Sequence, residues 1–373
     1  MKKQGLRNAS ASLIAILAGL LAGFVILLIT KPESALQGLV IILKGGFNNG
    51  MKGLGQVLYL ATPLIMTGLS VGFAFRTGLF NIGAPGQLMV GGAVSVWVGV
   101  TWSFLPNGLH WVVGLLMGML AGGIWGLVPG FFKARLNVNE VISSIMMNYI
   151  GMYGINFLIR GSAIFDSTKN QTKNVLPGGV IPKGGLDKIF YNLTGKYVDV
   201  SSVNAGILVA IVLAVVMYVL LNKTTFGYEL RACGFNKNAA RYAGISEKRT
   251  IVLSMVLAGA LAGTAGALMY LAPASGMHIH VAEVLSAQGF NGIPVALLGL
   301  SNPIGIIFSA LFVAYISVGG TYLQSLKYMQ EVIDIIIAMV IYFSAFSLLV
   351  RDLIGRIGKK RAQRGHDAGG DNA

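Results

Sequence analysis

The sequence predicts an all-α polytopic membrane protein with about ten transmembrane helices, some of them broken. Of its 373 residues, 55% are hydrophobic and only 11% are charged, and the mean hydropathy is +0.73. A soluble domain of this length would carry about a quarter charged residues. Apolar runs recur along the whole chain, and each is long enough to cross a hydrocarbon core of about 30 Å. Glycine and proline interrupt the apolar pattern at two places, which predicts the helix breaks.

Ten apolar runs give the predicted spans. The boundaries are least defined near 284–323, where only Ser301, Asn302 and Pro303 separate two runs. The spans are 11–30, 54–75, 88–105, 111–132, 140–159, 205–222, 251–272, 284–300, 303–323 and 332–350.

The first apolar run has some features of a signal peptide, because Lys2 and Lys3 precede it. The run is about 20 residues long, which exceeds the apolar core of a signal peptide. Thr-Lys-Pro-Glu follows it, where a cleavage site would have small residues. We therefore predict that 11–30 is retained as an additional first span.

Glycine spacing predicts how the fourth span packs. Small residues that recur every four positions form a smooth face, which lets helix backbones approach closely. The residues are Gly114, Gly118, Gly122, Gly126 and Gly130. This pattern is typical of a multi-helix bundle and carries no information about a substrate.

The net charge of +15 is distributed as expected for membrane topology. If the N-terminus is cytoplasmic, most of the 28 Lys and Arg residues lie in inner segments, above all in 223–249 and 351–364. We therefore expect both termini in the cytoplasm, a basic cytoplasmic tail at 351–373 and an extracytoplasmic segment at 161–204. This distribution argues against a nucleic-acid partner.

Two segments interrupt the helical pattern, at 77–92 and at 288–299. Each holds a Phe-Asn pair followed by a proline: Phe80, Asn81 and Pro85 in the first, and Phe290, Asn291 and Pro294 in the second. Breaks at membrane depth survive only where they are buried in protein or face a water-filled cavity.

The positions of the breaks predict two inverted-topology halves, 54–160 and 251–350. Under the predicted topology the first half begins outside and the second begins inside, and broken helices of such repeats commonly meet near the midplane. The alternative is that both segments are ordinary turns whose similarity arose by chance, because this sequence is rich in glycine.

No enzymatic motif is present in the sequence. It lacks a P-loop, H-E-x-x-H and G-x-S-x-G. The single cysteine, Cys233, excludes an intramolecular disulfide. His278 and His280 with Glu283 allow a metal site, but spacing alone fixes no ligand geometry, and we favour solvated or interfacial histidines. We expect no metal and no cofactor on this chain.

Polar groups inside the predicted spans are mostly neutral. Such groups suit hydrogen bonding to an uncharged polar solute, although a membrane asparagine more often bonds to another helix. The candidate pathway residues are Phe80, Asn81, Gln87, Asn148, Gln288, Phe290 and Asn291.

Residues 223–250 form a polar island between apolar spans. Asn236 is a good N-cap, Lys237–Ala243 predicts a short helix, and Gly244 is expected in the left-handed conformation after it. A helix this short is unstable alone in water, so it requires a partner surface. The alternative is a solvated basic loop.

Three motifs resemble one family, the permeases of ABC importers of the sugar and branched-chain amino acid type. Arg231-Ala-x-Gly-x-Asn-x-x-Ala-Ala-x-x-x-Gly-Ile245 looks like their coupling loop, although it lacks the Glu-Ala-Ala of the best-known examples. Phe80-Asn-Ile-Gly-x-x-Gly-Gln87 resembles their most recognisable motif. Asn139-Glu-Val-Ile-Ser-Ser-Ile-Met-Met-Asn-Tyr149 is similar to the nucleoside and simple-sugar branch. The resemblance covers about 54–350.

The resemblance implies the permease subunit of an ATP-driven importer. The island would contact a cytoplasmic ATPase, which carries ATP and Mg²⁺, and an extracytoplasmic binding lipoprotein and a second permease would complete the system. The implied coupling residues are Glu229, Arg231, Gly234, Asn236, Ala240, Arg241 and Gly244. The expected solute is a nucleoside, and the alternative is a simple sugar such as ribose or galactose. An ion-coupled secondary transporter is the alternative from another class, since inverted halves occur there too.

Overall fold

A computed structural model describes residues 2–273 and 277–345, and these residues are largely helical. They form two compact units, one of residues 2–45 with 316–345 and one of residues 46–315. The predicted tail at 351–373 and the end of the predicted span 332–350 lie outside the described residues.

In the first unit, α1 packs against α13. Lys31 follows α1, and its Nζ donates a hydrogen bond to the carbonyl oxygen of Lys327 at 2.7 Å. The predicted span 11–30 lies within α1, whereas α2 was not predicted. The elements are α1 (Lys2–Thr30), η1 (Pro32–Ser34), α2 (Ala35–Lys44), η5 (Tyr322–Leu326) and α13 (Gln330–Ala345).

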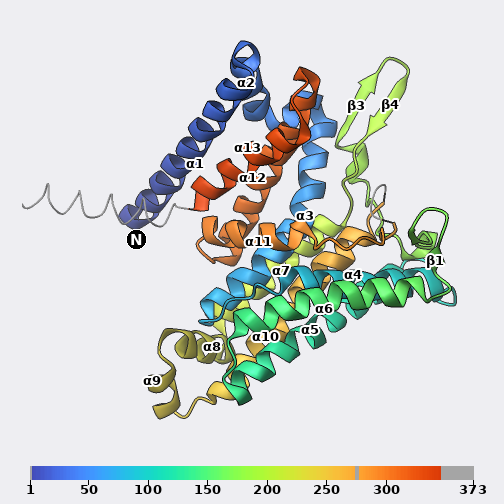
Figure 1. Cartoon of the computed structure of the whole chain (residues 1–373). Coiled ribbons are helices and arrows are strands. Elements are labelled where there is room, and N and C mark those ends of the chain that lie inside the picture. The colour runs from blue at the N-terminus through green and yellow to red at the C-terminus, as the bar shows by residue number, and fades with distance from the viewer. Residues whose placement is uncertain (1, 274–276, 346–373) are drawn as a thin grey trace, which may run out of the picture. The chain divides into compact units, whose positions relative to one another are not determined.

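The second unit is built around α10, which packs against α3, α4 and α5 (Figure 1). Helix α11 lies along α3, and α6 lies along α4 and α5. The helices that precede the polar island are α3 (Gly50–Arg76), α4 (Ala84–Thr101), α5 (His110–Leu136), α6 (Glu140–Arg160) and α7 (Gly206–Lys223). Those that follow it are α10 (Glu247–Tyr270), α11 (Ala287–Leu298) and α12 (Pro303–Thr321), of which the residues from Ile316 on belong to the first unit, and η2 (Gly45–Asn49) precedes α3.

Glycines allow α5 and α10 to pack backbone to backbone. A Cβ atom added to Gly122 would collide with the carbonyl oxygen of Gly259, and one added to Gly263 would collide with that of Gly118. The predicted packing role of the glycine stripe in α5 is therefore confirmed.

The segment between α6 and α7 contains two antiparallel hairpins. Phe165 pairs with Thr172 in the first, and Tyr191 pairs with Val200 in the second. Figure 1 shows β1 at the end of α6 opposite to α8 and α9. The elements are β1 (Phe165–Asp166), β2 (Gln171–Thr172), η3 (Pro177–Gly179), η4 (Leu186–Lys188), β3 (Tyr191–Thr194) and β4 (Tyr197–Val200).

Six described segments are long and apolar enough to cross a membrane, which supports a multi-pass helical protein and leaves the count of ten a prediction. The helical part of the predicted span 284–300 is α11 alone. Helix α11 has only 12 residues and is about 18 Å long, well short of the hydrocarbon thickness. The six segments are Pro32–Arg76, His110–Leu136, Glu140–Arg160, Gly206–Lys223, Glu247–Tyr270 and Pro303–Leu326.

Residues 77–83 separate α3 from α4, so the helical pattern is interrupted where the first break was predicted. The second was misplaced, because Pro294 lies inside α11 and the chain leaves the helix only at 299–302. Proline removes one helical hydrogen bond, but its fixed φ is compatible with a helix, so the helix continues. The turn itself has Leu300 and Ser301 at φ values of +54° and +52°.

Candidate functional site

The polar island folds into two short helices, α8 (Thr225–Phe235) and α9 (Lys237–Tyr242). The Asn236 side-chain oxygen accepts a hydrogen bond from the Ala239 amide at 3.1 Å, which confirms the predicted N-cap. Gly244 has φ +79°, which confirms the predicted left-handed residue after α9. Helix α8 was not predicted, because its mixed sequence has no apolar run.

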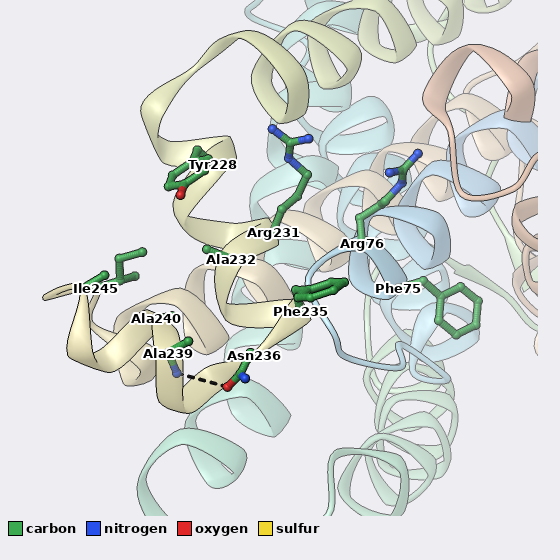
Figure 2. A pocket seen from close by; sticks show the side chains of 12 residues that line it. Phe75, Arg76, Tyr228, Arg231, Ala232, Phe235, Asn236, Ala239, Ala240 and Ile245 are labelled. Atoms are coloured by element: carbon green, nitrogen blue, oxygen red, sulfur yellow. Dashed lines mark hydrogen bonds between the residues drawn. The ribbon is translucent and has the colours of Figure 1, made fainter. Parts of the chain in front are cut away.

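An open groove of about 680 Å³ is lined by α8, α9 and the end of α3. Figure 2 shows the side chains that line it. They are Phe75, Arg76, Tyr228, Arg231, Ala232, Gly234, Phe235, Asn236, Ala239, Ala240, Ala243 and Ile245.

The predicted coupling residues divide between two neighbouring cavities. Arg231, Gly234, Asn236 and Ala240 line the larger groove. Glu229 and Gly244 line a second cavity of about 270 Å³, and Ala243 and Ile245 line both. Arg241 is exposed on α9, outside the lining of these two cavities.

Three exposed aromatic side chains on this surface were missed by the sequence analysis. Phe235 and Tyr242 are each 96% exposed, and Tyr228 is also exposed. Large aromatic residues of this kind supply much of the binding energy at protein interfaces. Their occurrence within a polar island was the signal that could have identified them.

Helix α8 contacts the first break directly through two glycines. A Cβ atom on Gly234 would lie 2.6 Å from the carbonyl carbon of Thr77 and 2.7 Å from the amide nitrogen of Gly78. Gly78 itself has φ +73°, a conformation that L-residues rarely adopt. Both positions therefore require glycine, and α8 cannot shift toward α3 without moving the break.

The two turns are also connected to each other. The Arg76 side chain, at the last residue of α3, donates from Nε to the carbonyl oxygen of Ser301 at 3.0 Å. Residues 76–78 therefore contact both α8 and the turn between α11 and α12.

A buried amide network stabilises the first break. Asn81 Nδ2 donates to Gln87 Oε1 at 2.8 Å and to Ser70 Oγ at 2.9 Å, and Gln87 Nε2 returns a bond to Asn81 Oδ1 at 3.2 Å. All three side chains are buried. Internal partners therefore bond to two of the predicted pathway residues, Asn81 and Gln87.

Asn148, in the middle of α6, supplies the missing N-terminal cap of α4. The N-cap residue of α4 is Gly83, which has no side chain to accept a bond. Asn148 Oδ1 accepts from the Gly86 amide at 2.9 Å, and its Nδ2 donates to the Ile82 carbonyl oxygen at 3.0 Å. A side chain of another helix thus satisfies two backbone groups at the start of α4.

The segments that carry the two Phe-Asn motifs contact each other. Phe80 stacks on Phe75 with ring centroids 5.3 Å apart, and it packs against a buried cluster that includes residues of α4, α10 and α11. Gly289, in the first turn of α11, lies against Pro85 with no room for a Cβ atom. Beside it, Gln288 and Asn291 are half-buried and Phe290 is 37% exposed.

The cysteine and the histidine pair do not form a metal-binding cluster. Within 2–273 and 277–345 the structure shows no group of three or more His, Cys, Asp or Glu residues arranged to hold a metal. His278 and His280 contact each other through their Nε2 atoms at 3.2 Å, and burial, followed by the charges of His280 and Lys169, lowers the pKa of His278. Burial raises the pKa of the Cys233 thiol.

The apolar helices indicate a multi-pass helical membrane protein, and two short helices, α8 and α9, lie beside the turn between α3 and α4. The family model of the branched-chain amino acid transport system / permease component matches residues 53–345. The chain belongs to this family, and it is a membrane transport component and not an enzyme.

Individual relatives agree with the family match. The guanosine ABC transporter permease protein NupP of Bacillus subtilis is 38% identical, over 94% of this chain and 97% of its own length. The glucose ABC transporter permease protein TsgB13 of Haloferax volcanii is 32% identical, over 86% and 82%. A second guanosine ABC transporter permease protein of B. subtilis, NupQ, is 27% identical, over 82% and 92%. No solved structure matches this chain.

Proposed function

We propose that this chain is the nucleoside-conducting permease of an ATP-driven importer and that it receives the motion of a cytoplasmic ATPase through α8 and α9. The observation that carries the proposal is the backbone contact between Gly234 of α8 and Gly78 of the first break. A displacement of α8 therefore acts directly on the helices that line the pathway. The exposed Phe235 and Tyr242 side chains provide the apolar surface that the ATPase would cover.

The proposed topology places 223–250 in the cytoplasm and 161–204 outside. Figure 1 supports this, since the segments lie at opposite ends of α6. We further propose that 54–160 and 251–350 are inverted halves and that 11–30 is an additional span. Both termini, including the basic tail, are then cytoplasmic.

One crossing in the second half is discontinuous in this proposal. Helix α11 is too short to cross a hydrocarbon core alone, so it forms only part of the span predicted at 284–300. Such half-helices end near the midplane site in other transporters. Gln288, Phe290 and Asn291 lie at the start of α11, and they are the residues we assign to the solute. Phe80, Asn81, Gln87 and Asn148 shape the pathway by holding the first break.

The proposed partners are those of a binding-protein-dependent ABC system. They are an ATPase that carries ATP and Mg²⁺, a second permease and an extracytoplasmic binding lipoprotein. The paired names NupP and NupQ in one organism support a heterodimeric pore. NupP and NupQ also support a nucleoside as the solute, and TsgB13 supports a simple sugar as the second candidate.

Asn236→Ala is expected to weaken binding of the ATPase. The substitution removes the N-cap of α9, which costs about 1 kcal/mol and would reduce affinity about fivefold. Affinity of the purified permease pair for the ATPase measures the effect. Asn238→Ala is the matched control, because Asn238 is exposed on the same helix and caps nothing in the described structure. Equal affinities for the two variants would contradict the assignment of α9.

Asn291→Ala is expected to lower nucleoside uptake at limiting solute by about tenfold, because a site built for polar groups loses a hydrogen-bond partner. Uptake of a panel of nucleosides and simple sugars, in cells that lack the native gene, measures both rate and solute class. Asn222→Ala, on α7, serves as the control. Unchanged nucleoside uptake would remove Asn291 from the pathway, and uptake of sugars alone would favour the second candidate.

A further inference from the structure

The larger groove contains two arginines from different parts of the chain. Arg76 ends α3, and Arg231 lies on α8. Both side chains are half-buried, and they are close enough that their positive charges repel each other. Figure 2 shows both guanidinium groups directed to the same side, away from Asn236 and Ala239.

Neither guanidinium has a carboxylate partner among the residues that the structure describes. The groove lining contains no Asp or Glu. The acidic residue nearest in sequence, Glu229, lines the other cavity. Arg76 Nε donates to a backbone carbonyl, and Arg231 Nε makes a long bond of 3.4 Å to the Gly227 carbonyl oxygen.

Two half-buried cations without a carboxylate partner attract an anion, since partial burial removes some of the water that otherwise stabilises them. An arginine fork binds a carboxylate through two parallel hydrogen bonds. Phe235 borders the same groove and is 96% exposed, so an occupant that brings both a carboxylate and apolar surface fits the site. A side chain of a protein partner meets both requirements.

We propose that the Arg76 and Arg231 pair receives an acidic side chain of the ATPase subunit. The inference rests on the proposed function and adds to it the chemistry of the partner. Binding at this pair engages α3 itself as well as the island, because Arg76 is the last residue of that helix. Arg76 directly precedes the turn between α3 and α4, and its side chain donates a hydrogen bond to Ser301 in the turn between α11 and α12. An acidic group bound to Arg76 would therefore be linked to both turns.

Arg231→Gln tests this proposal, because Arg231 has no role in either break that the described contacts show. The affinity of the permease pair for the ATPase is measured in nanodiscs over a series of NaCl concentrations. We expect the variant to bind about tenfold more weakly and with a shallower salt dependence than the wild type, since a charge pair is lost. Arg231→Lys is expected to recover part of the affinity, because lysine keeps the charge without the fork.

Lys248→Gln is the matched control, since Lys248 is exposed at the start of α10 and lies outside the groove lining. If the wild-type complex assembles but Arg231→Gln and Lys248→Gln bind the ATPase with equal affinity and equal salt dependence, the inference is wrong and the proposed function stands. A wild-type pair that binds no ATPase would overturn the proposed function as well. Repeating the titration in phosphatidylcholine nanodiscs identifies a lipid occupant. If the Arg231→Gln effect exists only with anionic lipid, the site binds a phosphate headgroup and the inference is wrong.

Discussion

Gly234→Ala is expected to reduce nucleoside transport more than tenfold. The three atoms nearest to the new Cβ atom would all be backbone atoms. They are the Thr77 carbonyl carbon at 2.6 Å, the Gly78 amide nitrogen at 2.7 Å and the Arg76 carbonyl oxygen at 2.9 Å. Backbone atoms cannot rotate away as a side chain can, so the end of α8 must move off the break. Overpacking of this kind costs about 1–3 kcal/mol. ATP hydrolysis and solute uptake by the same reconstituted complex measure the effect, and we expect uptake to fall more than hydrolysis.

Gly154→Ala is the control for this experiment. Gly154 lies in α6, and a Cβ atom there meets no atom within 4 Å. The substitution is expected to leave transport unchanged, and alanine is the better helix former. If Gly234→Ala transported as well as Gly154→Ala, the contact between α8 and the break would have no role in coupling.

Asn148→Ala is expected to lower the free energy of unfolding by about 2–4 kcal/mol. The change leaves the Gly86 amide and the Ile82 carbonyl oxygen without their partner in a buried site, and each orphaned group costs about 1–3 kcal/mol. Thermal unfolding in detergent, followed by intrinsic fluorescence, measures the loss.

Asn222→Ala provides the comparison for stability. Its side chain donates only to the Tyr218 carbonyl oxygen within its own helix, so we expect a loss below about 1 kcal/mol. Similar midpoints for Asn148→Ala and Asn222→Ala would show that water enters the break and satisfies the freed groups. The buried amide network would then not be what stabilises α4.

Local signals in the sequence predicted the features that depend on neighbouring residues. Asn236 and Gly244 were identified as the cap and the left-handed residue because helix ends are determined by a few adjacent positions. The first break was predicted because Gly78 and its neighbours disfavour a continuous helix. The glycine face of α5 was predicted because its spacing matches the helical period.

Features that depend on tertiary contacts were not predicted. Pro294 suggested a break within 288–299, but the packing of α11 along α3 keeps the helix intact until Gly299. The contact between Gly78 and Gly234 joins residues far apart in the chain. A single glycine in a sequence can have many structural roles, so neither glycine predicts the other as its partner. The sequence could identify Asn148 as a polar residue in a span, whereas its capping role depends on where α4 lies.

Uptake by reconstituted proteoliposomes measures whether ATP hydrolysis on a partner subunit drives nucleoside transport through this chain. The full complex of this chain, its second permease and the ATPase is inserted into vesicles, and the binding lipoprotein is supplied on the opposite side with labelled nucleoside. We expect uptake that requires hydrolysable ATP on the ATPase side and that Gly234→Ala largely abolishes. Ion-driven uptake by this chain alone, without the ATPase or ATP, would contradict it.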